Sequence, residues 1–195
     1  MKRESLVYMI SGTVFGVLVG WIIGSQQARP AAPGLPSAPS AATAAPSSDA
    51  PPPLDVQRAA TLERTAQAEP SNSLVRMELA NLYYDAQRFD LAATWYEAVL
   101  KLDPHNVNAS TDLAVCYHYQ GEGTRALAQI DRSLTIDPKH TKTLLNQGII
   151  RFQLKDVDGA VKSWQRIIDI APGSEDAKRA QMGLDGINGS RGGRS

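Results

Sequence analysis

Prolines recur at a fixed interval of 34 residues through the C-terminal two thirds of the chain, and this period constrains the fold more than any other feature. They stand at Pro70, Pro104, Pro138 and Pro172. Small and large residues keep the same interval in three columns: Ala80, Ala114, Gly148; Ala92, Ala126, Ala160; and Tyr96, Ile130, Trp164. A period of this length indicates one structural unit repeated along the chain, each copy burying its apolar face against its neighbours.

Three successive segments carry the pattern and resemble the tetratricopeptide repeat. The first two read LANLYYDAQRFDLAATWYEAVLKLDP and LAVCYHYQGEGTRALAQIDRSLTIDP. The third, GIIRFQLKDVDGAVKSWQRIIDIAP, has Arg151 where an aromatic residue is usual. The resemblance implies an all-α fold in which each 34-residue unit is a helix, a turn and a second helix. Each proline follows a second helix and ends it, because proline cannot continue a helix.

The repeat divides this part of the chain into an α-solenoid of three units with flanking helices. The units are expected at 73–106, 107–140 and 141–173, with helices near 73–86, 89–102, 107–120, 123–136, 141–154 and 157–170. A leading helix is expected within 54–70. A capping helix over 174–187, with Ser174 as its N-cap, would cover the last apolar face. Residues 188–195 are expected to form a flexible tail.

The N-terminal part of the chain predicts a membrane anchor. Residues 6–24 carry no charge and as a helix would be roughly 28 Å long, close to the ~30 Å hydrocarbon core of a bilayer. Lys2 and Arg3 precede this run within the stub 1–5, so the positive-inside rule places the stub in the cytoplasm. A cleaved signal peptide is the alternative to this signal-anchor, although its apolar region is normally shorter and ends at a small-residue cleavage site.

Four glycines lie four residues apart within the predicted span. Gly12, Gly16, Gly20 and Gly24 would trace one helix face, and small residues allow close helix packing in lipid. The alternative is that glycine is simply commoner in membrane helices than in soluble ones. Residues 25–53 are rich in proline and alanine, which predicts a disordered, semi-rigid linker. The chain therefore looks like a single-pass protein of a bacterial inner membrane, with a periplasmic C-terminal domain.

No residue pattern in the chain predicts catalysis or cofactor binding. His105, His118 and His140 have no second histidine four residues on, and Cys116 is the single cysteine, expected to be a small buried hydrophobe. No phosphate-binding glycine loop is present. The 20 basic and 20 acidic residues balance, which argues against a nucleic-acid partner. We therefore expect no enzyme activity, no metal, no cofactor and no small-molecule substrate.

The resemblance implies a concave wall, built from the first helix of each unit, that binds a partner. Mapping the family's pattern onto this sequence predicts a groove of twelve residues: Asn81, Tyr84, Asp85, Asn108, Thr111, Asp112, Val115, His118, Tyr119, Lys142, Asn146 and Phe152. Met77, Leu145 and Ile149 fall on the same wall and also suit packing between helices. Chaperone-binding members grip a C-terminal carboxylate, and Asn81 and Lys142 match that pattern, whereas Met77, Asp112 and Asn146 do not. Because Asp112 would repel a carboxylate, a chaperone tail is disfavoured.

These features predict a non-catalytic protein-binding scaffold or assembly factor of a membrane-associated complex, which holds a peptide or helix segment in the groove. An integral structural subunit of a stable membrane complex or homo-oligomer, held mainly by the glycine-faced helix, is the alternative. The stretch GAVKSWQRIIDIAPGSEDA is similar to segments of periplasmic tetratricopeptide proteins that present apocytochromes for haem attachment. That similarity implies cytochrome c maturation as a narrower hypothesis.

Overall fold

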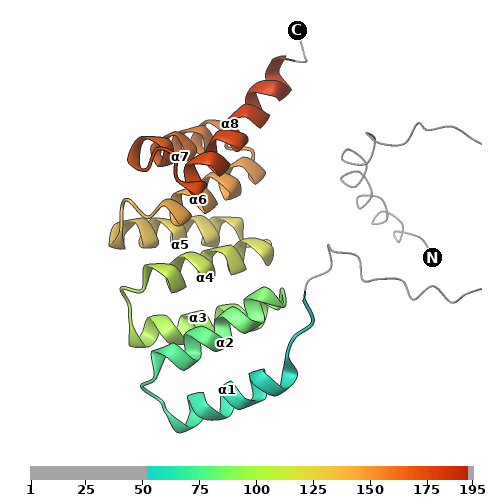
Figure 1. Ribbon diagram of the computed structural model, residues 1–195, viewed down its shortest axis with the longest axis vertical. Coiled ribbons are helices and arrows are strands. Elements are labelled where there is room, and N and C mark those ends of the chain that lie inside the picture. Colours follow the sequence, from blue (N-terminus) through green and yellow to red (C-terminus); the bar gives the residue numbers. More distant parts are fainter. Residues whose placement is uncertain (1–51, 193–195) are drawn as a thin grey trace, which may run out of the picture. The chain divides into compact units, whose positions relative to one another are not determined.

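The computed structural model describes residues 52–192, with side chains described up to residue 189. Eight helices and no strand occur in this part of the chain, and they stack in chain order (Figure 1). The predicted all-α repeat fold is confirmed for these residues. The helices are α1 (Val56–Ala68), α2 (Ser73–Asp85), α3 (Phe89–Leu102), α4 (Val107–Tyr119), α5 (Gly123–Ile136), α6 (Thr141–Gln153), α7 (Val157–Ile170) and α8 (Glu175–Gly192).

The predicted stub, membrane span, glycine face and linker all lie outside the described residues. Among residues 52–192, no helix is both long enough and apolar enough to cross a bilayer. The anchor therefore stays a prediction from the sequence.

Polar side chains begin several helices at the positions where the repeat turns. Asn72 accepts hydrogen bonds from the backbone N–H groups of Leu74 and Val75 at 3.1 and 3.2 Å, and Asn106 accepts one from Ala109 at 3.0 Å. These bonds satisfy N–H groups that have no partner within the helix. The observed bounds of α2 to α7 accordingly lie within one residue of the predicted ones.

The last helix is longer than the sequence predicts. Ser174 accepts a hydrogen bond from the backbone N–H of Ala177 at 3.1 Å, as expected for an N-cap. However, α8 continues to Gly192, so residues 188–192 are helical and not part of a flexible tail. The glycines and asparagine of this segment have low helix propensity, which is why the sequence predicts an earlier end. Ile187 is only 4% exposed and packs into the core, which holds this end of the helix in place.

Small and large residues face each other where the two helices of a unit cross. In the first two units Ala80 and Ala114, both fully buried, stand in the column that glycine occupies in the third. A Cβ atom added at Gly148 would lie 2.1 Å from Nε1 of Trp164, so only glycine fits against this tryptophan. The Trp164 indole donates a hydrogen bond to the Leu145 carbonyl at 3.3 Å, which fixes the ring in that position.

The apolar core divides into two clusters. The first spans α1 to α5 and includes Ile150 of α6, and the second joins α6, α7 and α8 around Leu144, Trp164 and Ile167. Polar contacts connect α6 to the two helices before it. The Thr111 hydroxyl of α4 lies 2.6 Å from the Thr143 hydroxyl of α6, and the Gln147 amide of α6 donates to Asp131 of α5 at 3.3 Å. We call this set, together with the ion pair of Asp112 and Lys142, the polar seam.

Candidate partner-binding groove

A hollow of about 450 Å³ lies along the first helices of the three units. Its lining side chains come from α2, α4 and α6, and from one residue of α3. We call it the groove hollow, and its lining residues are Met77, Asn81, Tyr84, Asp85, Tyr96, Asn108, Asp112 and Lys142. All of these residues except Tyr96 were predicted to lie on the concave wall. The fold brings them together although they are up to 65 positions apart in the chain.

An ion pair closes one side of the groove hollow. The Lys142 ammonium lies 2.6 and 2.9 Å from the two carboxylate oxygens of Asp112, whose side chain is almost completely buried. Burial raises the pKa of the Asp112 carboxyl, while Lys142 and His140 lower it and the nearby Asp85 carboxylate raises it further. Because Asp112 already compensates Lys142, the lysine does not offer an uncompensated positive charge to a ligand.

Two amide side chains provide hydrogen-bonding groups in the groove hollow. The Tyr96 hydroxyl donates to Oδ1 of Asn81 at 2.8 Å, which leaves the N–H groups of that amide to donate elsewhere. The Asn108 side chain is exposed beside it. Amides that can donate and accept suit the backbone of a bound peptide. The sequence could not single out Tyr96, because its column in the repeat predicts only a buried core residue.

Tyr84 supplies the aromatic surface of the groove hollow. Its ring meets Phe89 edge-on, with centroids 5.6 Å apart, and meets Tyr96 in the same way at 6.3 Å. Such edge contacts between rings hold the side chain in one orientation. Burial raises the pKa of the Tyr84 hydroxyl far above its usual range, so the phenol stays neutral at physiological pH.

The other predicted aromatic residues lie outside the groove hollow. Tyr119 is 63% exposed and stacks on Phe89, with centroids 4.3 Å apart. Phe152 is 44% exposed beside Trp164, and His118 is half-buried against Tyr119. These side chains, and the half-buried Asn146, are on the predicted helices but do not line the hollow.

Two predicted groove residues belong to the core. Thr111 is fully buried and bonds the Val107 carbonyl at 2.7 Å and the Thr143 hydroxyl, and Val115 is 7% exposed. The physical reason is that α4 is central and packs against α3, α5 and α6, so every residue from 109 to 117 is buried. Of the three wall residues also suited to packing, Leu145 is buried, Met77 lines the hollow and Ile149 is exposed.

The arrangement suits binding and provides no reactive group. Asp85 and Asp112 against Lys142 give the groove hollow a net charge of −1, with the Asp85 carboxylate exposed. Cys116 is fully buried as predicted, and burial raises the pKa of its thiol to about 12, so it is not a nucleophile at neutral pH. Within residues 52–192 no three metal-ligating side chains come together.

Comparison with known proteins agrees with the repeat architecture. A family profile described as tetratricopeptide repeat matches residues 55–107 and 77–141, and a second profile of the same description matches residues 142–174. Hsp70-Hsp90 organizing protein 3 of Arabidopsis thaliana is 26% identical over 126 residues, which is 65% of this chain and 22% of the relative. Cytochrome c-type biogenesis protein CycH of Pseudomonas aeruginosa is 28% identical over 131 residues, 65% of this chain and 32% of the relative.

Solved structures share the fold at low sequence identity. A crystal structure of MamA has a TM-score of 0.59 at 17% identity and covers 67% of this chain and 77% of its own. The first TPR of Spaghetti (RPAP3), bound to the HSP90 peptide SRMEEVD, has a TM-score of 0.53 at 22% identity. This match covers 60% of the present chain and 93% of the RPAP3 chain. The chain spans about a fifth to a third of the length of the curated relatives described above.

Proposed function

Because the chain belongs to the tetratricopeptide repeat family, we propose that it is a non-catalytic scaffold that holds a segment of a partner protein in the groove hollow. One observation carries the proposal. Asn81, Tyr84, Asp85 and Asn108 leave an aromatic face, amides and a free carboxylate open in one hollow. A peptide or helix segment presents the matching apolar side chains and backbone groups.

The groove is tested by recovering partners with the tagged full-length protein in mild detergent and identifying them by mass spectrometry. Tyr84→Ala should reduce recovery of the specific partner and weaken its binding by about 1–2 kcal/mol, roughly five- to thirty-fold. Arg166→Glu, on α7 and outside the groove hollow, is the matched surface control. Circular dichroism checks that both variants are folded. If Tyr84→Ala binds like the parent protein and Arg166→Glu does not, the partner occupies another face.

We place this scaffold at a membrane on the basis of the sequence alone. The uncharged run 6–24 after Lys2 and Arg3 supports a single-pass anchor with the repeat domain outside the cytoplasm. A reporter that is active only after export, fused after Ser195, should be active. Activity from a reporter that works only in the cytoplasm would contradict this orientation. We also propose that Gly12, Gly16, Gly20 and Gly24 pack against another helix, which Gly16→Leu with Gly20→Leu should weaken.

A narrower role in cytochrome c maturation is supported by the similarity to CycH. The partner segment would then be an apocytochrome region that carries the haem attachment motif C-x-x-C-H. A synthetic peptide with this motif should bind the full-length protein, and Tyr84→Ala should weaken that binding. A substoichiometric, exchanging complex is expected for an assembly factor, whereas stoichiometric copurification would favour a permanent structural subunit.

A further inference from the structure

A second hollow, of about 560 Å³, lies between the second helices of the first two units. Its walls come from α3 and α5, and α4 forms its floor. We call it the outer hollow, and its lining residues are Glu97, Leu100, Lys101, Pro104, Ser110, Leu113, Tyr117, Arg125, Ala128, Gln129, Arg132 and Ile136. None of these lines the groove hollow.

The two hollows lie on different sides of α4. Asn108 and Asp112 of this helix line the groove hollow, while Ser110, Leu113 and Tyr117 line the outer hollow. At 3.6 residues per turn, Asn108 and Ser110 point about 200° apart around the helix axis. A ligand in the outer hollow therefore meets a different face of the molecule from one in the groove.

One column of the repeat on the floor of the outer hollow differs between the three units. In the first unit this column holds Arg76, whose guanidinium reaches back to the carbonyls of Ala66, Glu69 and Asn72. In the third unit it holds Leu144, which is fully buried in the core. In the second unit it holds Ser110, whose hydroxyl accepts hydrogen bonds from Gln129 and Ser133, both at 2.7 Å.

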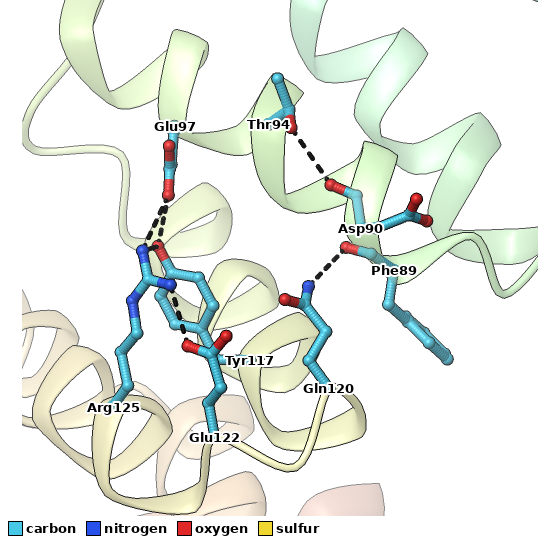
Figure 2. A network of polar contacts seen from close by, with 8 residues as sticks. All are labelled: Phe89, Asp90, Thr94, Glu97, Tyr117, Gln120, Glu122 and Arg125. Atoms are coloured by element: carbon cyan, nitrogen blue, oxygen red, sulfur yellow. Dashed lines mark hydrogen bonds and ion pairs between the residues drawn. The ribbon is translucent and has the colours of Figure 1, made fainter.

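One end of the outer hollow is closed by a hydrogen-bonded network (Figure 2). The Tyr117 hydroxyl donates to Glu97 at 2.6 Å, and the Arg125 guanidinium bonds both Glu97, at 3.2 Å, and the Tyr117 oxygen, at 2.9 Å. Arg125 also pairs with Glu122 at 2.8 Å and lies 3.7 Å above the centre of the Tyr117 ring. The single carboxylate that lines the hollow, that of Glu97, is therefore paired with Arg125 and Tyr117 through its Oε1 atom.

The rest of the outer hollow combines apolar surface with uncompensated positive charge. The half-buried Leu100 and Ile136 supply the apolar surface, and Leu113 lies beneath them in the floor, only 2% exposed. Lys101 and Arg132 are exposed on the rim, and neither has a hydrogen bond or ion pair with the described residues. With Arg125 and Glu97 included, the lining carries a net charge of +2. The hollow is therefore complementary to a carboxylate that stands next to an apolar side chain.

We propose that the outer hollow is a second binding site, which takes an acidic segment of a partner protein. An apolar side chain of the segment lies against Leu100 and Ile136, and adjacent Asp or Glu side chains pair with Lys101 and Arg132. Such opposite charges at the rim of an interface speed association and select the partner. This site is independent of the groove, so the inference does not rest on the function proposed above.

The test is selection of heptapeptides from a random phage-displayed library on the full-length protein in detergent. Selected peptides that depend on the outer hollow should combine Asp or Glu with a large apolar residue. Each is then compared with its amide counterpart, in which Asp is replaced by Asn and Glu by Gln. The acidic peptide should bind at least tenfold more tightly, and its affinity should fall as salt rises from 0.15 M toward about 1 M, where charges are screened within 3 Å.

Four variants assign the peptide to the outer hollow. Ala128→Trp, at an exposed lining position, should fill the space and abolish binding, and Arg132→Glu should weaken it at least tenfold. Ser110→Leu copies the third unit and should also abolish binding, although it removes hydrogen-bond partners of Gln129 and Ser133. The control is Arg166→Glu, which stands in the same repeat column as Arg132 but outside the hollow and should bind normally.

The outcomes separate this site from the groove. Tyr84→Ala should leave binding of the acidic peptide unchanged, since Tyr84 lies in the groove hollow. The proposal is overturned if the selected peptides bind Ala128→Trp and Arg132→Glu as tightly as the parent protein. It is equally overturned if the amide counterparts bind as well as the acidic peptides, because the positive rim would then play no part.

Discussion

Asp112 and Lys142 hold each other inside the groove hollow, and this pair decides which charge the groove accepts. In the Asp112→Asn variant, Lys142 loses its partner and its ammonium becomes free to bind an anion. We expect the full-length variant to bind a heptapeptide without Asp or Glu, through its C-terminal carboxylate, about three- to thirtyfold more tightly than the parent, equivalent to about 0.7–2 kcal/mol. Isothermal titration calorimetry measures this change. Asp169→Asn, an exposed carboxylate on α7, is the control, and an equal gain there would contradict the argument.

The same substitution removes a pH-dependent contribution to stability. Because burial raises the pKa of Asp112 above 3.8, the folded state binds this proton more tightly than the unfolded state. The contribution of Asp112 to stability therefore grows as the pH falls through the raised pKa toward 3.8, and it is lost as the pH rises. Urea unfolding at several pH values should show this dependence in the parent protein and its loss in Asp112→Asn.

Alkylation of the Cys116 thiol can be used to detect opening of the core around this residue. The thiol is fully buried and its pKa is raised to about 12 from 9.0, so the folded protein should resist alkylation by iodoacetamide at neutral pH. Above about pH 9 the unfolded state ionises first, which favours unfolding and should expose the thiol. Mass spectrometry of the alkylated protein follows the reaction. Rapid modification at pH 7, without loss of helicity, would show that Cys116 is accessible in the folded state.

At the scale of the helices, the crossing of α6 and α7 differs from the crossings in the other two units by a coupled exchange of residue size. Gly148→Ala puts a methyl group against the Trp164 ring and should destabilise the protein by about 1–3 kcal/mol, despite the better helix propensity of alanine. Adding Trp164→Ile recreates the pairing of Ala114 with Ile130 in the second unit and should recover most of the loss. Urea unfolding of both variants measures the free energies. Equal stability of Gly148→Ala and the parent would mean that Trp164 moves aside at little cost.

The helices of the three units could be predicted within one residue because proline, the cap residues and the small–large columns all repeat with the same period. The end of α8 could not, because its last residues have low helix propensity and are held by burial of Ile187. The same distinction applies to the groove. Its positions on α2 follow from the pattern, whereas on α6 only Lys142 lines the hollow. Thr111 and Val115 are buried because α4 has neighbours on several sides, which only the packed structure reveals.

For the described domain as a whole, the polar seam lies between the two apolar clusters, and we expect it to be the weakest boundary. Repeat proteins are stabilised by contacts between neighbouring units, so α6 to α8 should open more readily than α2 to α5. Hydrogen exchange of the full-length protein should show lower opening free energies in α6 to α8. Thr111→Val with Thr143→Val replaces the buried hydroxyl pair with apolar groups of similar shape and should reduce the difference, although it also removes the hydrogen-bond partner of His140 Nδ1. Equal opening free energies throughout would show that the seam does not divide the domain.

Helix α4 separates the two hollows, since it supplies Asn108 and Asp112 to one and Ser110, Leu113 and Tyr117 to the other. With both sites occupied, the protein links two partners in a ternary complex. By mass action, the amount of this complex passes through a maximum as the concentration of the protein rises. Below that concentration too few copies of the chain are present, and above it each partner is held by a separate copy of the chain. If both proposed sites bind their partners, overproduction of the protein should therefore lower the amount of ternary complex.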